Sequence, residues 1–320
     1  FVFLFHPSGD THAIHREEFR LRRKSAVPGG MEHAIFGILG MRAERSELGR
    51  KMRVLQDVLL HTHHIILSLD ICKQHCTINP TMKQQVAQRI LEENRASYDK
   101  MAKEFSDTRG HFWGELSFLA EHALPGMRVL DIGCGNGRFF PLLRVRQVTY
   151  TGVDNSKGLL DAARNKYPDT QFVEGDATAL PFPDSSFDIA FSFATIHHIP
   201  GRAFQAAFVH EAARVLKPGS TFILTSWDLH TPHWRWNLLR STFRNLIPFS
   251  PHDRGDVFLT FGKTKQPRYV HAFTLPALER LLTENGFTIV GSEIVGRAVA
   301  PGKHVRKKTE QNLLVIARKK

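Results

Sequence analysis

The 320-residue sequence has only three cysteines, which are too few for a disulfide framework. It also lacks an uncharged apolar run of about 18 residues, the length that a membrane-spanning helix needs. The most apolar stretch, residues 54–71, contains two aspartates and three histidines. Both absences favour a cytoplasmic protein without a membrane span.

Acidic residues are few relative to basic ones, 31 against 43, so the formal net charge is +12. Residues 82–320 carry 32 basic and 23 acidic residues, a net charge of +9. This excess favours a polyanionic partner such as RNA. A basic protein without a nucleic-acid partner can have the same composition. The choice between these two interpretations therefore depends on the sequence motifs.

Residues 1–81 show no sustained hydrophobic period of 3.6 or 2 residues, and they begin with Phe1 rather than Met. We expect a poorly structured N-terminal extension, or sequence translated upstream of a start at Met82. Two cysteines and a histidine in residues 72–76 could bind zinc with the three histidines of residues 61–64. Their spacing matches no standard zinc finger, so we expect no metal site there.

From residue 82 onward the hydrophobic pattern indicates a helical lead-in over 82–126, followed by alternating strands and helices. Such alternation predicts a parallel sheet with helices on both faces. The expected helices cover 83–105, 113–122, 157–166, 202–216 and 276–285. The expected strands cover 127–132, 149–154, 170–174, 187–193, 220–227, 287–295 and 312–318. The last two strands should form a hairpin.

The most informative segment is 129–138, an apolar strand that leads into three alternate glycines, Gly133, Gly135 and Gly137. Glycines in such a turn let backbone N–H groups approach a ligand that any Cβ would keep away. About 20 residues later a second strand ends in Asp154, whose carboxylate can accept hydrogen bonds from both ribose hydroxyls. The pattern predicts a site for a nucleotide-like cofactor.

Arg138 stands where a dinucleotide-binding turn has a further glycine. That glycine lets the following helix pack closely beside a pyrophosphate, so its absence disfavours NAD and FAD. S-adenosylmethionine (SAM) contains a ribose and an adenine but no phosphate. A tight turn and an acid without a pyrophosphate cradle therefore fit SAM.

At these residues the sequence resembles the class I SAM-dependent methyltransferases, and three further motifs, 172–177, 180–192 and 211–220, follow in the family's order. The resemblance implies a Rossmann-like α/β fold with helices on both faces of a seven-stranded, mostly parallel sheet. Its strand order is expected to be 3-2-1-4-5-7-6, with an antiparallel last strand. The residues expected to hold SAM are Tyr98, Asp131, Gly133, Cys134, Gly135, Gly137, Asp154, Asn155, Asp176, Ala177 and Ser192.

Residues 228–273 form a long insert between the fifth strand and the last helix, at the carboxyl edge of the predicted sheet. Loops at this edge commonly determine substrate specificity. Aromatic residues alternate with arginines in the insert, which suits stacking on bases and contact with phosphates. A helical cap whose aromatic residues only form a core is the competing interpretation.

The segment after the fourth strand, residues 193–199, lacks the Asn/Asp-Pro-Pro-aromatic motif of exocyclic-amine methylation. This disfavours adenine and protein amines as acceptors. His197 and His198 lie in the segment and could act as acid or base, or could only shape the pocket. Methyl transfer from a sulfonium is an in-line displacement, so a base is needed only if the nucleophile begins protonated.

A narrower resemblance, to the eukaryotic tRNA wobble-uridine carboxymethyl methyltransferases, lies outside the cofactor motifs. It rests on residues 98–109 with Trp113, and on residues 256–257 followed by 268–273. The acceptor in that family is a carboxylate, which is already a nucleophile at neutral pH. The resemblance therefore explains why no obvious base is present.

Two arginines, Arg109 and Arg268, lie in the segments that carry this resemblance, and would orient the carboxylate by paired hydrogen bonds. His197 and Tyr269 complete the set of candidate catalytic residues. We expect a SAM-dependent methyltransferase that O-methylates a carboxymethyl-uridine type of carboxylate on tRNA. A small accessory activator protein is a further candidate partner.

Two other functions remain open at this point. One is a methyltransferase for a small molecule such as a quinone or a secondary metabolite. The other is a non-catalytic RNA-binding module that keeps the fold, which the intact glycines and both acids disfavour. A basic face around the insert would favour tRNA, whereas a closed apolar pocket would favour a small acceptor.

A chain that begins at Met82 is expected to keep its cooperative thermal melt and its affinity for SAM, because the preceding residues show no structural period. Calorimetry on the shortened and the full chain measures both properties. Loss of soluble folding in the shortened chain would show that the extension packs on the domain.

Overall fold

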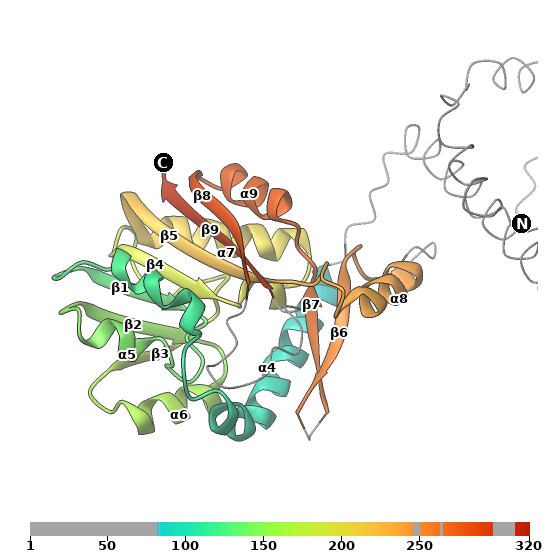
Figure 1. Ribbon diagram of the computed structural model, residues 1–320, viewed down its shortest axis with the longest axis horizontal. Coiled ribbons are helices and arrows are strands. Elements are labelled where there is room, and N and C mark those ends of the chain that lie inside the picture. The colour runs from blue at the N-terminus through green and yellow to red at the C-terminus, as the bar shows by residue number, and fades with distance from the viewer. Residues whose placement is uncertain (1–81, 83, 246–249, 263–264, 297–310) are drawn as a thin grey trace, which may run out of the picture. The chain divides into compact units, whose positions relative to one another are not determined.

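Figure 1 shows a computed structural model of the chain, which describes residues 82, 84–245, 250–262, 265–296 and 311–320. All of them belong to one of the two units into which the chain divides, Asn79–Lys320. The proposed N-terminal extension and the cysteines and histidines considered for zinc lie outside the described residues. None of the described helices is both long and apolar enough to span a membrane.

Seven strands form the main sheet: β1 Arg128–Ile132, β2 Thr149–Asp154, β3 Gln171–Glu174, β4 Phe187–Phe193, β5 Leu216–Asp228, β8 Phe287–Gly296 and β9 Gln311–Lys319. Their order is β3-β2-β1-β4-β5-β9-β8. The pairs among β1 to β5 are parallel, whereas β9 runs antiparallel to both β5 and β8. Since β8 and β9 are the sixth and seventh strands of this sheet, the predicted order and the antiparallel last strand are confirmed.

Helices cover both faces of this sheet, as the alternating pattern predicted (Figure 1). One core cluster joins the sheet to α7, Arg202–Val215, and α9, Leu275–Glu284. A second cluster joins the sheet to the 3-10 helix η1, Gly114–His122, the short helix α5, Phe140–Arg144, and α6, Lys157–Lys166. Because both faces are covered, the central strands β1 and β4 are almost continuously buried, which explains why most of their residues are apolar.

The helical lead-in is α4, Gln84–Thr108, which packs against α6 and against strand β7, Gln266–His271. Its contact with α6 is close, because a Cβ at Gly158 would lie 2.8 Å from the Cβ of Ala102. Asp99 accepts hydrogen bonds from Ser156 Oγ at 2.7 Å and from Gly158 N at 3.1 Å, and so fixes the start of α6. The lead-in thereby becomes one wall of the carboxyl edge of the sheet.

The insert is not the helical cap of the competing interpretation. It contains α8, Arg235–Asn245, and a separate antiparallel pair formed by β6, Asp256–Phe261, and β7. The pair forms because Val257, Leu259 and Val270 bury their side chains in one small cluster. Strand β5 also begins earlier than expected, at Leu216, and the helix expected over 113–122 is a 3-10 helix.

Asp131 on β1 is a buried acid whose charge is set by the packing of the sheet. Its side chain is 2% exposed, and Tyr150 on β2 donates a hydrogen bond from Oη to Asp131 Oδ2 at 2.8 Å. Burial raises the pKa of Asp131 to about 7, although this hydrogen bond acts in the opposite direction and the charge of Asp154 raises the pKa further.

Stability is therefore expected to fall as the pH rises from about 4 to about 7. In the unfolded chain Asp131 ionises near 3.8, while in the fold it keeps its proton to about 7. The stability that the protonated Asp131 contributes is complete below the unfolded-state pKa of 3.8. It is lost as the pH rises to the folded-state pKa of about 7. Asp131→Asn keeps an acceptor for Tyr150 but cannot titrate. Denaturant unfolding at several pH values measures the free energy of unfolding of both proteins. The advantage of the variant over the parent should grow with pH, by on the order of 2–4 kcal/mol at pH 7.5. A difference independent of pH would contradict the raised pKa.

Candidate cofactor and acceptor sites

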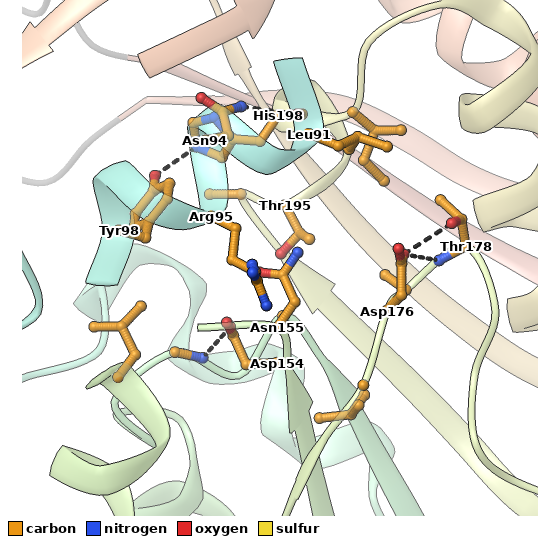
Figure 2. Close-up of a pocket in the computed structure, with 18 of the residues that line it drawn as sticks. Leu91, Asn94, Arg95, Tyr98, Asp154, Asn155, Asp176, Thr178, Thr195 and His198 are labelled. Carbon is orange, nitrogen blue, oxygen red and sulfur yellow. Dashed lines mark hydrogen bonds between the residues drawn. The ribbon is translucent and has the colours of Figure 1, made fainter. Parts of the chain in front are cut away.

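A first pocket lies where the carboxyl ends of the parallel strands meet α4 (Figure 2). Its wall contains seven of the residues predicted to bind the cofactor: Tyr98, Gly133, Gly135, Asp154, Asn155, Asp176 and Ala177. Four others lie outside this wall: Asp131, Cys134, Gly137 and Ser192. We call this cavity the cofactor pocket.

The glycine turn after β1 has positive φ angles of 75°, 56° and 71° at Gly133, Gly135 and Gly137. A Cβ at Gly135 would meet no atom closer than 3.9 Å, so the turn keeps free space beside its backbone. A Cβ at Gly137 would lie 2.9 Å from the ring of Phe172, so packing alone requires a glycine there. Of the three glycines, only Gly135 therefore borders open space that a side chain would fill. A ligand that approaches the backbone closely needs such a space.

Two carboxylates line the cofactor pocket at the ends of the neighbouring strands β2 and β3. Asp154 accepts hydrogen bonds from Gly135 N at 2.8 Å and Ser156 N at 2.9 Å, one to each carboxylate oxygen. Burial raises the pKa of Asp154, while these backbone donors act against that shift. Asp176 accepts from the backbone N and the Oγ1 of Thr178 with Oδ1, both at 2.8 Å, which leaves Oδ2 as an acceptor for a ligand. These carboxylate oxygens can accept hydrogen bonds from the hydroxyls of a ribose and from an adenine amine.

The remaining predicted residues hold the turn from behind. Ser192 Oγ donates to Ile132 O at 3.0 Å and is fully buried. Cys134 is a free, buried thiol whose sulfur would lie 2.9 Å from a Cβ at Gly152. Asp131 has its hydrogen bond to Tyr150 within the sheet. These three side chains shape the cofactor pocket without facing it.

A second pocket brings together residues that are far apart in the sequence. It is lined by Arg109, Trp113, Trp227, Asp228, His233, Trp234, Arg268, Gln311 and Asn312. The two arginines predicted to orient an acceptor thus share one cavity with three tryptophans. It lies at the end of β5 and the beginning of its antiparallel neighbour β9, which is the carboxyl edge of the sheet. We call it the acceptor pocket.

The two arginines are placed by different elements. Arg109 follows α4, and its carbonyl accepts a hydrogen bond at 3.1 Å from Nδ2 of Asn136 in the glycine turn. Arg268 is on β7 with 5% of its surface exposed, and its guanidinium lies 5.3 Å from the ring centre of Trp227. A cation beside an indole in a buried position is favourable, so this contact holds Arg268 at the pocket wall.

Tyr98 and His198 both line the cofactor pocket (Figure 2), and Tyr98 also receives a hydrogen bond from Arg268 of the acceptor pocket. His198 Nδ1 donates to the carbonyl of Tyr269 at 2.8 Å, so His198 Nε2 accepts from Tyr98 Oη at 2.7 Å. Burial lowers the pKa of His198 to about 3, and the charge of Arg268 adds to this shift. Burial raises the pKa of Tyr98, while the charge of Arg268 and a hydrogen bond from it oppose the change. A neutral chain of hydrogen bonds therefore links the cofactor pocket to Arg268.

The other two candidate catalytic residues line neither pocket. His197 is fully buried, accepts a hydrogen bond from Trp227 N at 3.3 Å, and packs its ring 4.6 Å from that of Trp227. Burial, followed by the charge of His198, keeps the pKa of His197 well below its usual value. Tyr269 donates from Oη to Asp256 Oδ1 at 2.6 Å. The structure thus places both residues where they support the acceptor pocket from outside.

Several pocket residues carry no motif that sequence reasoning could detect. Arg95 extends from α4 towards Asn155 over the cofactor pocket (Figure 2). Asn94, one position earlier, donates to the carbonyls of His198 at 3.0 Å and Tyr269 at 3.3 Å. Trp227 was within reach of prediction, because it stands near the carboxyl end of the fifth strand. For Asn94 and Arg95, the sequence indicated only that they belong to a helix.

The comparisons with known proteins agree with this geometry. A family model described as a methyltransferase domain matches residues 130–224. Over 198 residues the chain is 33% identical to ECU09_1500 of Encephalitozoon cuniculi, which is named as a methyltransferase. The match covers 60% of this chain and 86% of that protein. The chain belongs to the SAM-dependent methyltransferases, and its cofactor is SAM.

Two other relatives match the same core of the chain. The identity is 32% over 130 residues with the tRNA (carboxymethyluridine(34)-5-O)-methyltransferase of Arabidopsis thaliana, covering 41% of this chain and 31% of the relative. It is 41% over 126 residues with the fatty-acid O-methyltransferase of Mycolicibacterium smegmatis, covering 37% and 44%. The chain thus spans less than half of the length of either relative.

Solved structures show the same fold. A SAM-dependent methyltransferase of Methanosarcina mazei superimposes with a TM-score of 0.54 at 23% identity, over 65% of this chain and 98% of that one. A Haloferax volcanii methyltransferase, solved in complex with the Trm112 methyltransferase activator, gives 0.50 at 18% identity, over 71% and 97%. At these identities the likeness extends to the architecture alone.

Asp154→Ala is expected to weaken SAM binding at least tenfold. The substitution removes the carboxylate that accepts hydrogen bonds from the ribose hydroxyls, and such bonds to a charged acceptor contribute about 1.5–3 kcal/mol to binding. Isothermal calorimetry measures the affinity, and a thermal melt separates this effect from loss of the turn. Asp169→Ala, at an exposed position before β3, is the matched control. Equal affinities for parent and Asp154 variant would refute the ribose contact.

Proposed function

We propose that this enzyme transfers the methyl group of SAM to a carboxylate oxygen on tRNA, of the carboxymethyluridine type. The observation that supports it most directly is the acceptor pocket, in which two arginines meet three tryptophans. Paired guanidinium groups recognise a carboxylate through charge-assisted hydrogen bonds. Indole rings offer stacking surfaces for a base that has been turned out of its strand.

The charge of the acceptor pocket also favours a carboxylate. Its acid, Asp228, accepts hydrogen bonds from the backbone N of His230 at 2.8 Å, and the His230 ring lies 3.4 Å away. A side-chain hydrogen bond from His230 lowers the pKa of Asp228. Asp228 is therefore already engaged by hydrogen bonds from His230. Arg109 and Arg268 then make the pocket attractive to an anion.

The histidine pair favours an acceptor that needs no base. Burial lowers the pKa of His198 to about 3 and keeps that of His197 well below its usual value. A group with so low a pKa removes a proton poorly at neutral pH. A carboxylate is already ionised, whereas the hydroxyl of a quinol or phenol has to lose its proton. The pair therefore suits a carboxylate better than a hydroxyl.

When bound, SAM supplies a methyl group on a sulfonium that leaves as a neutral thioether. The contribution of the chain is to position the two reactants. Gly135 and Asp154 would hold the cofactor from the turn and the end of β2, while Arg109 and Arg268 would orient the acceptor oxygen. Tyr98 lies between the residues that would hold the cofactor and those that would orient the acceptor. Arg268 donates a hydrogen bond to Tyr98, and this bond and the charge of Arg268 both act to lower the pKa of Tyr98.

Two relatives support an acid as the acceptor, because their names describe methylation of a carboxymethyl group and of a fatty acid. A small carboxylic acid is accordingly the second candidate. The acceptor pocket contains Gln311 and Asn312 as well as the arginines, which is a poor lining for an acyl chain. The nucleic-acid acceptor is therefore the one we favour.

A small activator protein is part of this proposal, since the Haloferax volcanii neighbour was solved with the Trm112 activator. The proposal also includes a cytoplasmic location. The free thiol of Cys134 beside the cofactor turn is consistent with the reducing conditions of that compartment.

Arg268→Ala is expected to lower kcat/KM for tRNA by about 10- to 100-fold, the loss of one charge-assisted contact, and to change SAM affinity less than twofold. Arg268→Lys should recover only part of the loss, because an ammonium lacks the planar fork. Arg280→Ala, an exposed arginine on α9, is the control. An Arg268 variant that loses SAM binding and turnover equally would contradict the assignment to the acceptor.

Methyl transfer from labelled SAM should occur on tRNA that carries carboxymethyluridine, and should weaken steeply with salt, because bound phosphates release counterions. The rate should not rise between pH 6 and 9 in the manner of an ionising hydroxyl. Incubation with tRNA and, separately, with a small-molecule extract distinguishes the acceptors. Label that enters only the small-molecule fraction would overturn the proposal in favour of the small acid.

A further inference from the structure

Helix α8 in the insert buries polar side chains and exposes most of its large apolar ones. The side facing strand β6 carries Ser241 and Asn245, which are both buried. Ser241 Oγ donates a hydrogen bond to the carbonyl of Asp256, and Asn245 Nδ2 donates to the carbonyl of Asp253 at 3.0 Å. The helix is therefore attached to the insert through these polar contacts and through Leu238, which packs on the cluster around Val257 and Leu259, while its other large apolar residues stay outside.

The outer side of α8 carries the large apolar side chains. Trp236 is 67% exposed, Phe243 68% and Leu239 41%. Their spacing of three and four residues places them in one stripe along the helix. Isolated exposed apolar residues are ordinary, but a stripe with two aromatic rings on a helix that buries serine and asparagine indicates an interaction surface.

This stripe is bordered by positive charge. The helix contains Arg235, Arg240 and Arg244, all exposed, and no acidic residue. Arg235 lies 5.6 Å from the ring centre of Trp236, and Arg244 lies 5.7 Å from that of Phe258. Aromatic faces interleaved with guanidinium groups match a polyanion that also offers rings for stacking. Lipid headgroups offer the charge without the rings.

The position of α8 relates this surface to the acceptor pocket. His233 and Trp234 line the acceptor pocket and directly precede the helix. Figure 1 shows α8 beside β6, and the partner strand of β6, β7, carries Arg268. A chain that places one base in the acceptor pocket can therefore lay its neighbouring nucleotides along the outer side of α8.

We propose that Trp236, Leu239, Arg240, Phe243 and Arg244, together the α8 platform, bind the single-stranded nucleotides that flank the methylated base of an RNA. This inference rests on the proposed function for the identity of the acceptor, but the platform's binding of RNA can be measured without methyl transfer. The aromatic residues stack on bases and the arginines neutralise phosphates. Affinity for the RNA then comes largely from outside the acceptor pocket.

The test uses the full chain with three paired substitutions. Trp236→Ser with Phe243→Ser removes the rings, and Arg240→Gln with Arg244→Gln removes two charges. Arg144→Glu with Val145→Ser changes an exposed arginine and an exposed apolar residue at the end of α5, which lies far from α8 in Figure 1. Each variant is titrated with a labelled anticodon stem–loop oligonucleotide, and its turnover is measured on tRNA and on the free carboxymethyluridine nucleoside.

The expected results are specific to the long substrate. The ring variant should bind the oligonucleotide at least tenfold more weakly and lose as much kcat/KM on tRNA, with turnover of the nucleoside within twofold of the parent. The charge variant should lower the slope of log affinity against log salt by about 1.4, since each contact with a single strand contributes about 0.7. The α5 variant should match the parent in every assay.

Three results would overturn the platform. The first is oligonucleotide binding unchanged in both α8 variants. The second is an equal loss of turnover on tRNA and nucleoside, which would mean that α8 only supports the acceptor pocket. The third is loss of binding to phosphatidylserine vesicles with RNA binding intact, which would make α8 a membrane-facing helix. A parent enzyme that binds the oligonucleotide through α8 but methylates no RNA would instead refute the proposed function alone.

Discussion

The side-chain amide of Asn94 joins three segments by hydrogen bonds: α4 and the segment after β4, which line the cofactor pocket, and β7, which carries Arg268 of the acceptor pocket. Its Nδ2 donates to the carbonyls of His198 and Tyr269, and its Oδ1 accepts from Tyr269 N at 2.8 Å. The group is 6% exposed, so each of these bonds replaces one that water would otherwise make. The lead-in helix, the segment after β4 and strand β7 are thereby fixed together, which sets where Arg268 stands relative to the cofactor pocket.

Burial of this junction also decides which of its groups are charged. The low pKa of His198 keeps the ring neutral, so its two nitrogens have fixed roles, one donating to Tyr269 O and one accepting from Tyr98. Arg268, whose guanidinium stays charged, then stands beside a neutral histidine pair. A protonated histidine beside it would repel the guanidinium, so the neutral pair and the buried arginine are mutually consistent.

The fold alone says little about the acceptor, since sheets of this order host many chemistries. The distinguishing parts are the insert and the residues before β1, which come from opposite sides of the cofactor motifs in the sequence. Arg109 is held by Asn136 of the glycine turn, and Arg268 by the contact with Trp227. The cofactor turn therefore also helps to position one half of the acceptor pocket.

The sequence by itself determined most of the strands and the position of the cofactor turn, because strand periodicity and glycines act over a few neighbouring residues. The sheet order was predicted only through the resemblance to the methyltransferase family. It did not determine which of those residues face the cofactor. Gly135 and Gly137 look alike in the sequence, yet one borders free space and the other packs on Phe172. Likewise, Arg268 and Tyr269 are adjacent, and only strand alternation sends one side chain to the acceptor pocket and the other to Asp256. The acceptor pocket, the β6–β7 pair and the exposed apolar stripe of α8 were decided only by the tertiary structure, because each depends on contacts between segments that are distant in the sequence.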